Sequence, residues 1–170
     1  EITIFNFEQL EKYVRVLKNE ERIKVHMKFN TGMNRLGFDE KETEKLIEKI
    51  KVIPNIDIMS IYSHISDVGN EKETEKQIAR YERIVSIFDK NEVKYGVKHI
   101  QASPLLFKYK GKYNYDFARI GMALYGMEPL SYDVGLLDVI TVKSQIINIR
   151  NVKKNNKISY GSKGVVNRDS

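Results

Sequence analysis

Short apolar segments typical of strands alternate with amphipathic helical segments along most of this chain, and this alternation limits the fold more than any other feature. The predicted strands are 2–5, 25–29, 56–63, 97–101 and 115–119. Three helices are predicted. The first spans 7–17, and the second begins with Asp39 as its N-cap and ends near Pro54. The third is long, and its buried face carries Ile78, Tyr81, Ile84, Val85 and Phe88. Strands that alternate with helices form parallel β/α units with right-handed crossovers. We therefore expect an α/β fold.

Four predicted strands end at a polar or ionisable residue. These residues are Lys28, His64, Ser103 and Arg119. In parallel β/α folds the functional groups lie at the carboxyl ends of the strands, which meet on one rim. The sequence thus predicts a binding site formed by these four side chains.

The segment VHMKFNTGMNRLGF, residues 25–38, joins one strand to a turn. Its apolar residues alternate with His26 and Lys28 as in a half-buried strand, and Asn30, Thr31 and Gly32 are turn formers. Lys28 and Arg35 fall on either side of this corner. Two cations and free backbone NH groups at a strand end favour an anionic ligand.

Composition excludes several classes of protein. The chain has no cysteine, which rules out disulfides, zinc–thiolate sites and thiol nucleophiles within it, and we expect no metal. No apolar run is long enough to span a membrane and the first residues do not resemble a signal peptide, so we expect a cytoplasmic location and no membrane partner. The net charge is +6, but the lysines are interleaved with glutamates as on solvated helix faces. We therefore predict no nucleic-acid partner, and small anionic ligands instead.

The pattern changes after Pro129. Residues 136–150, LLDVITVKSQIINIR, are rich in β-branched side chains and lead through the polar turn NVKKNN to KISYG. A long β-branched stretch of this kind predicts strands. We expect a domain boundary near residues 128–135 and the start of an all-β domain after it.

Five motifs in order resemble the alanine racemase family. They are VHMKFNTGMNRLGF, IYSHISDV, HIQASPLL, DFARIGMALYGMEP and KISYG. Members of that family are pyridoxal phosphate enzymes with a TIM-like barrel followed by a β domain. The resemblance implies that residues 1–130 are part of a TIM-like (β/α)8 barrel that binds pyridoxal 5'-phosphate, from about the fourth to the eighth βα unit. Residues 131–170 then begin the C-terminal all-β domain.

The resemblance also implies roles in holding the cofactor. Arg119 resembles the arginine that faces the pyridine nitrogen, and because it stays protonated it leaves the ring a weaker electron sink. His64 resembles the residue that hydrogen-bonds this arginine, while Ser103 and the backbone NH groups of Gly121 and Met122 resemble the phosphate-binding groups. The alternative for Arg119 is a structural salt bridge to Asp116. His26 and His99 fall inside predicted strands, and no role is assigned to them.

Further residues correspond to the substrate side of the family's site. Arg35 resembles the arginine near the cofactor's phenolic oxygen and the substrate carboxylate, and Lys28 resembles a lysine that many members carry as a carbamate. Tyr160 resembles the catalytic tyrosine that reaches the site from the partner subunit, so the resemblance implies a homodimer. Two positions differ from the usual pattern: Asn30 stands where the family has Asp, and Ala102 where it has Asn.

The implied reaction is interconversion of L-alanine and D-alanine, which supplies D-alanine for peptidoglycan. None of the lysines stands in the context expected for the family's Schiff-base lysine, so we expect an internal fragment that is inactive alone and associates through its open sheet edges. Two alternatives stay open. One is a serine or broad-specificity amino-acid racemase of the same fold, and the other is a non-catalytic pyridoxal phosphate-binding barrel.

Overall fold

The computed structural model describes residues 1–16, 22–113, 115–128, 130–131 and 133–170. Leu17, at the end of the first predicted helix, and Pro129, at the change of sequence pattern, lie outside the described residues. Two compact units are distinguished, Glu1–Val139 and Ile140–Ser170. Each is described by itself, and the domain boundary near 128–135 stays a prediction.

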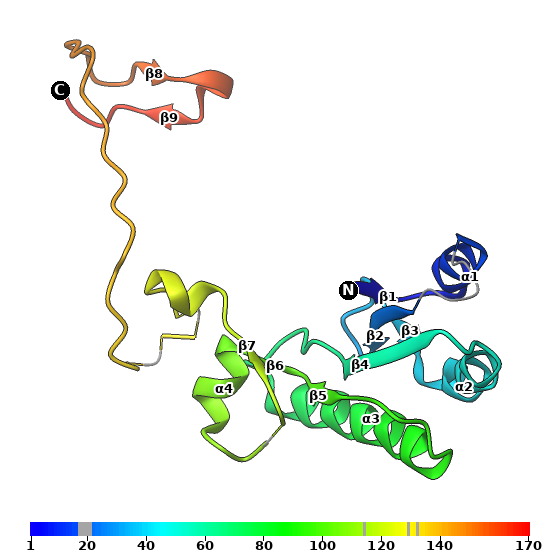
Figure 1. Cartoon of the computed structure of the whole chain (residues 1–170). Coiled ribbons are helices and arrows are strands. Elements are labelled where there is room, and N and C mark those ends of the chain that lie inside the picture. Colours follow the sequence, from blue (N-terminus) through cyan, green and yellow to red (C-terminus); the bar gives the residue numbers. More distant parts are fainter. Residues whose placement is uncertain (17–21, 114, 129, 132) are drawn as a thin grey trace. The chain divides into compact units, whose positions relative to one another are not determined.

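The first unit contains the alternating strands and helices that the sequence predicts (Figure 1). The elements in chain order are β1 (Ile2–Ile4), α1 (Phe7–Val16), β2 (Ile23–Asn30), β3 (Phe38–Asp39), η1 (Glu40–Glu42), α2 (Thr43–Lys51), β4 (Ile56–Tyr62), α3 (Glu71–Lys90), β5 (Val97–His99), β6 (Gln101–Ala102), α4 (Ser103–Tyr109), β7 (Ala118–Arg119) and η2 (Met122–Tyr125). Among these described elements the strands pair in the order β1-β2-β4-β5, with β3 beside β2, and β6 pairs with β7; every one of these pairings is parallel. The predicted α/β class and partial barrel are confirmed.

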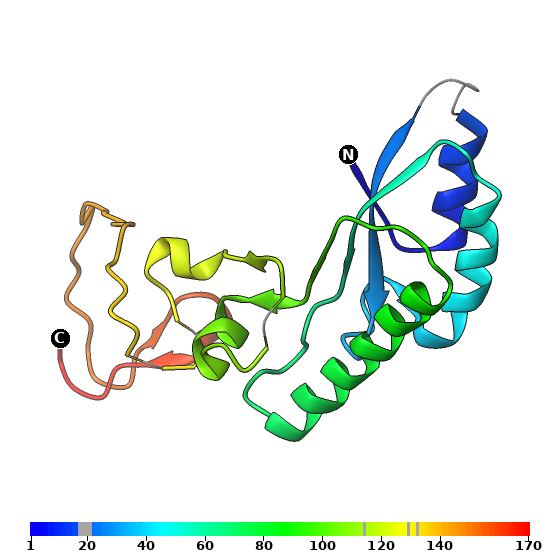
Figure 2. The same ribbon diagram turned by 60° about the horizontal axis from the view of Figure 1, so that its bottom comes forward.

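Helices α1, α2 and α3 all lie on one side of the sheet, as the two ribbon views show (Figure 2). Val25, Met27 and Phe29 point to that side and are almost fully buried. Phe29 meets Phe88 of α3 edge-to-face with ring centroids 5.7 Å apart. Because successive strand residues face opposite sides, His26 and Lys28 point away from this core. The face of the sheet that the helices leave free, called the free face below, is therefore available for polar groups.

Two predicted elements have different bounds in the structure. The strand predicted at 115–119 is limited to Ala118–Arg119. Before it, Asp116 is bonded to Lys98 of β5 by its backbone amide, over 3.1 Å to the Lys98 carbonyl, and by its side chain, whose Oδ2 accepts from the Lys98 amide over 2.8 Å. The helix predicted to begin at Asp39 starts with the 3-10 turn η1 and continues as α2. Both changes are local and leave the order of the elements intact.

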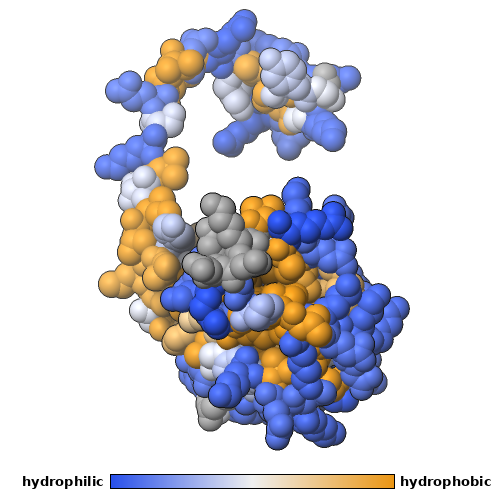
Figure 3. Space-filling model, turned by 45° about the vertical axis from the view of Figure 1, so that its right-hand side comes forward, coloured by the Kyte–Doolittle hydropathy of each residue, from blue (hydrophilic) through white to orange (hydrophobic). Residues whose placement is uncertain are grey.

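The second unit is a small hairpin, and here the strand prediction for residues 136–150 is wrong. The strands are β8 (Lys157–Ile158) and β9 (Gly164–Val165), antiparallel and joined through η3 (Tyr160–Ser162). Residues 136–150 form no strand, because no described segment pairs with them. Their apolar side chains are exposed, and Figure 3 shows hydrophobic atoms along the extended segment that leads to the hairpin. The exposed apolar residues of this segment are Leu137, Val139, Ile140, Val142, Ile146, Ile147 and Ile149.

None of the helices in the described part of the chain is both long and apolar enough to cross a membrane.

Candidate functional site

Seven of the eight predicted site residues line two cavities of the first unit. The first cavity, of about 490 Å³, is lined by Lys28, Arg35, His64 and Arg119 together with Thr3, Phe5, Leu36 and Tyr62. The second, of about 400 Å³, is lined by His64, Ser103, Arg119, Gly121 and Met122 together with Ala102, Pro104 and Ile120. His64 and Arg119 belong to both linings. The structure therefore brings these residues together as the strand ends predict.

The linings of the two cavities are positively charged. They contain the cations Lys28, Arg35 and Arg119, and no aspartate or glutamate is among the residues that line them. A concave surface with several cations and no carboxylate raises the local concentration of anions. The charge of the site favours phosphate and carboxylate groups.

Arg119 lies at the junction of the two cavities and is held by carbonyl and imidazole acceptors. Its Nη2 donates to the Ser63 carbonyl over 2.7 Å and to His64 Nδ1 over 3.0 Å, and its Nη1 donates to His99 Nδ1 over 2.5 Å. Burial, followed by the charge of Arg119, lowers the pKa of both His64 and His99 to about 4. Both imidazoles are therefore neutral near pH 7 and accept hydrogen bonds from the guanidinium.

These contacts change two expectations about Arg119. The alternative of a salt bridge to Asp116 is not found among the described residues, since the Asp116 carboxylate accepts the Lys98 amide instead. His99, to which the sequence assigned no role, contacts Arg119 as closely as His64 does. The sequence placed His99 inside the predicted strand 97–101, whereas β5 ends at His99, and its distance from Arg119 depends on the pairing of separate strands.

Lys28 is buried in the first cavity, with 7% of its surface exposed. Its Nζ lies 4.8 Å from the centroid of the Tyr62 ring. Burial, and then the charges of Arg119 and Arg35, lower the pKa of Lys28 to about 8. A substantial fraction of this amine is thus neutral and nucleophilic slightly above neutral pH.

Replacing Lys28 by methionine is expected to raise the free energy of unfolding at pH 7 in CO2-free buffer, by up to about 3 kcal/mol. The pKa of Lys28 is about 8 in the folded chain, below its unfolded value, so the charged form is disfavoured by folding. The gain should be full below pH 8 and should disappear as the pH rises toward 10.5. Urea denaturation at several pH values measures it. Lys24→Met is the control, because Lys24 is exposed on the same strand; equal effects of the two substitutions would contradict the expectation.

The corner that carries Arg35 is fixed at its base. Arg80 of α3 donates from Nη1 to the Thr31 carbonyl over 2.7 Å, and Ser63 donates from Oγ to the Phe29 carbonyl over 2.8 Å. Gly37 has a φ of +127°, and a Cβ there would lie 2.4 Å from the Phe29 carbonyl carbon, so only glycine fits. Arg35 itself is exposed and reaches the cavity from this fixed loop.

Asn30, where the sequence departs from the family pattern, organises the same corner. Its amide nitrogen donates to Asn34 Oδ1 over 2.9 Å and to Asp39 Oδ1 over 3.0 Å, while its Oδ1 accepts from the Asn34 amide. A carboxylate could not make the two donations. The amide of Asn30 therefore suits the neighbours Asn34 and Asp39.

Ser103 and Gly121 leave an open polar surface in the second cavity. Ser103 is 2% exposed, and its Oγ accepts a hydrogen bond from the Gly121 amide over 3.4 Å. No atom lies within 4 Å of the place a Cβ would take at Gly121. The backbone is thus accessible to a ligand there, as a phosphate cradle requires.

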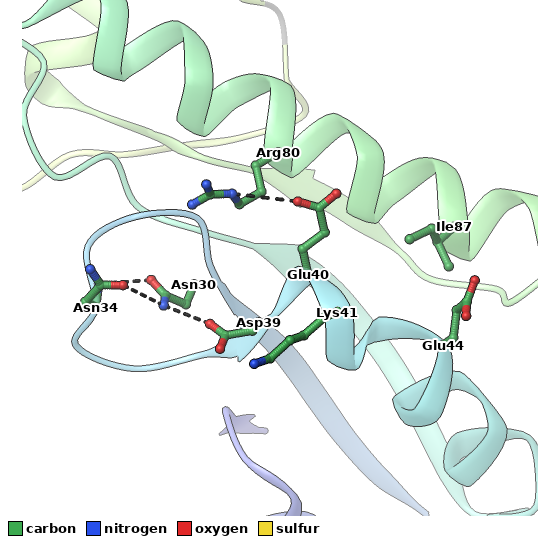
Figure 4. A pocket seen from close by; sticks show the side chains of 8 residues that line it. All are labelled: Asn30, Asn34, Asp39, Glu40, Lys41, Glu44, Arg80 and Ile87. Carbon is green, nitrogen blue, oxygen red and sulfur yellow. Dashed lines mark hydrogen bonds and ion pairs between the residues drawn. The ribbon is translucent and has the colours of Figure 1, made fainter.

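A wider cavity, of about 600 Å³, lies elsewhere, between η1, α2 and α3 (Figure 4). Two of its ionic groups are paired: Arg80 Nε lies 3.7 Å from Glu40 Oε2, and Glu40 also accepts from Arg83. None of the predicted site residues lines it. Within the described residues, no group of three or more His, Asp or Glu side chains is placed to hold a metal ion.

Tyr160, the eighth predicted residue, is not in the first unit. It lies in η3 between β8 and β9 of the second unit, and its side chain is fully exposed. Its role in the site therefore stays a prediction.

Comparison with known proteins decides the family. The family described as "Alanine racemase, N-terminal domain" matches residues 1–129. The chain belongs to the alanine racemase family. A serine/alanine racemase of Enterococcus gallinarum is 32% identical over 167 residues, covering 92% of this chain and 24% of that protein. An alanine racemase of Fusobacterium nucleatum is 33% identical over 151 residues, covering 86% of this chain and 41% of that protein.

A solved alanine racemase of Clostridium difficile superposes with a TM-score of 0.73 at 27% identity, over 98% of this chain and 45% of that one. The 170 residues therefore span less than half the length of each of these relatives. The predicted family membership is confirmed.

Proposed function

We propose that this chain is part of an alanine racemase, an isomerase that interconverts L-alanine and D-alanine with pyridoxal 5'-phosphate. One observation carries the proposal: seven residues predicted from separate motifs line two cavities that share Arg119 and His64. Functional residues of β/α folds lie together at the carboxyl ends of the strands, whereas residues that only pack in the core are spread along the strands and helices.

The residues present fit the cofactor. The site offers three cations without a lining carboxylate, a buried hydroxyl at Ser103 and an accessible backbone at Gly121. Ser103, Gly121 and Met122 would hold the phosphate, and Arg119 would face the pyridine ring. When bound, pyridoxal phosphate supplies an electron sink for the negative charge left at the α-carbon.

The chain's own residues then bind the substrate and move its proton. Arg35 presents a planar guanidinium that suits the carboxylate of alanine. Tyr160 exchanges the α-proton on one face of the substrate, and the family's Schiff-base lysine, for which these 170 residues offer no counterpart, acts on the other. Lys28, with its pKa lowered to about 8, reacts as the neutral amine with CO2, forming an N–C bond and releasing one proton to solvent; the negative charge of the resulting carbamate orients Arg35. Mass spectrometry of the protein in bicarbonate buffer should show an increase by the mass of one CO2. The increase should be absent in Lys28→Met.

A homodimer belongs to the same proposal. Tyr160 is fully exposed on a hairpin of the second unit, and a side chain that reaches a neighbouring subunit must be exposed in its own. We place Tyr160 in the partner's site on the strength of the family resemblance. A cytoplasmic location and a supply of D-alanine to peptidoglycan are further parts of the proposal.

A serine racemase is the second candidate, favoured by the 32% identity to the serine/alanine racemase of Enterococcus gallinarum. The two substrates differ by one hydroxyl, and a pocket must hydrogen-bond that hydroxyl to prefer serine strongly. The rates of racemisation of the two amino acids therefore distinguish the candidates.

The test is racemisation by the natural-length protein that contains this chain, loaded with pyridoxal phosphate. We expect kcat/KM for L-alanine to exceed that for L-serine at least about tenfold. Chiral chromatography of both products measures it. Equal values would favour a broad-specificity racemase, and cofactor binding without turnover of either amino acid would favour the non-catalytic barrel.

A further inference from the structure

A row of polar side chains crosses the free face of the sheet from Arg119 to the start of the chain. Each of four strands contributes one member, Arg119 from β7, His99 from β5, Ser60 from β4 and His26 from β2, and Glu1 precedes β1. The successive distances are 2.5 Å from Arg119 Nη1 to His99 Nδ1, 3.2 Å from His99 Nε2 to Ser60 Oγ, 2.7 Å from Ser60 Oγ to His26 Nδ1, and 3.1 Å from His26 Nε2 to Glu1 Oε2. We call these five residues the transverse chain.

The chemistry of the two ends fixes the direction of every hydrogen bond. A guanidinium has only donors, so His99 Nδ1 must accept from Arg119. A neutral imidazole has one N–H, so His99 Nε2 donates to Ser60 Oγ. At the other end an ionised carboxylate only accepts, and the hydrogen bond from His26 keeps the pKa of Glu1 below its usual value.

With His26 as the neutral imidazole, the middle of the row has a single consistent arrangement. His26 Nε2 donates to Glu1, which leaves His26 Nδ1 to accept from the Ser60 hydroxyl. All four donations therefore run the same way, from the guanidinium to the carboxylate. Hydrogen bonds aligned in one direction polarise and strengthen one another.

The row is most tightly enclosed near Arg119. Ser60 has none of its surface exposed and His99 only 9%, whereas the Glu1 side chain is half exposed. The His99 ring is stacked on Tyr62, with centroids 4.9 Å apart and planes inclined by 13°. His26 and Ser60 are register partners on neighbouring strands, so the sheet itself sets their distance. The ring of His99 is thus held in place by packing, and its tautomer by Ser60.

We propose that Ser60 and His26 are positioning residues for the racemase: they hold His99 as the Nε2–H tautomer, so that its Nδ1 accepts from Arg119 and fixes the guanidinium that would face the cofactor's pyridine nitrogen. Glu1 provides the terminal negative charge. The role of Arg119 beside the cofactor rests on the proposed function. The positioning of Arg119 by His99 rests on the hydrogen bonds that the structure shows. His99 and His64 then hold the two terminal nitrogens of Arg119 separately, so rotation of the guanidinium breaks at least one contact.

The first test reads the tautomers directly, by nitrogen-15 NMR of the imidazoles in the natural-length protein. In the wild type we expect both His26 and His99 to be protonated at Nε2 alone. In Ser60→Ala, His99 loses its acceptor and should become a mixture of tautomers, while Glu1→Gln, a surface change that leaves folding intact, should perturb His26 more than His99. A wild-type His99 that is already a mixture, or one unchanged by Ser60→Ala, would overturn the proposal.

The second test uses the kinetics of the cofactor-loaded protein. Ser60→Ala should lower kcat for alanine at least about tenfold with KM changed less than about twofold, as is usual when a residue that orients a functional group is lost. Ser60→Thr keeps the hydroxyl and should restore most of kcat. Thr74→Val is the matched control, because it removes a buried hydroxyl, bonded to the Asp67 carbonyl over 3.0 Å, away from the row. If Ser60→Ala and Thr74→Val lower kcat equally, the role of Ser60 is only structural.

The two tests separate this inference from the proposed function. If the wild type binds no pyridoxal phosphate and racemises nothing, the proposed function fails, while the imidazole spectra still decide whether the transverse chain fixes His99. If the wild type is active but neither the spectra nor kcat respond to Ser60→Ala, the positioning role fails alone.

Discussion

Arg119→Ala is expected to lower the free energy of unfolding by about 3 kcal/mol, because it leaves buried and partly buried acceptors without their donor. The orphaned groups are His99 Nδ1, His64 Nδ1 and the Ser63 carbonyl. Removing one cation should also raise the pKa of Lys28 from about 8, since Arg119 is the second cause of its depression. Urea denaturation measures the first effect, and titration of Lys28 by NMR measures the second.

Arg35→Ala is the matched control for Arg119→Ala. Both arginines line the same cavity, but Arg35 is exposed and lies on a loop fixed by other contacts. Its removal should change the free energy of unfolding by less than about 0.5 kcal/mol, as is usual for exposed side chains. If the two variants lose equal stability, the contacts of Arg119 do not stabilise the fold beyond those of a surface arginine.

Tyr160→Phe should reduce alanine racemisation by about 10²- to 10⁴-fold, the usual contribution of a positioned acid or base. The phenol is fully exposed in its own chain, so the free energy of unfolding should not change. Chiral analysis of product from the natural-length protein measures the loss. A variant that keeps wild-type activity would remove Tyr160 from the mechanism.

Mixing subunits tests whether Tyr160 acts in the partner's site. Tyr160→Phe and Arg35→Ala subunits are each inactive alone if both residues are needed. After dissociation and random re-pairing, half the dimers are mixed, and each mixed dimer has one site with neither lesion, so about a quarter of wild-type activity should return. No recovery would place Tyr160 and Arg35 of one chain in the same site.

The sequence predicted which strand-end residues come together, because the strand pattern sets which residues share a rim. The polar ends of separate strands, Lys28, His64, Ser103 and Arg119, could be proposed to converge from parallel topology alone, and they line the two cavities. The contacts of His99 could not be predicted in the same way, because they require the register of β5 against β4. The alternation in residues 25–29 already placed His26 on the same face of the sheet as Lys28. That pattern was the signal in the sequence for a role of His26.

The strand prediction for residues 136–150 failed for a different physical reason. β-branched residues favour an extended backbone, but a strand also needs a hydrogen-bonded neighbour. No described segment provides one, so Val142 and Ile147 remain exposed. Local sequence preference thus indicated the conformation of the backbone there and not its pairing.

The two cavities share His64 and Arg119, so under the proposed function a ligand in one cavity would be thermodynamically linked to a ligand in the other. A phosphate analogue in the cavity of Ser103 and a carboxylate in the cavity of Arg35 would both contact the same two side chains. Whatever factor the first ligand applies to the affinity of the second, the second must apply to the first. We therefore expect the binding of one small anion to change the affinity for the other, and the sign of that change would report whether Arg119 accommodates both at once.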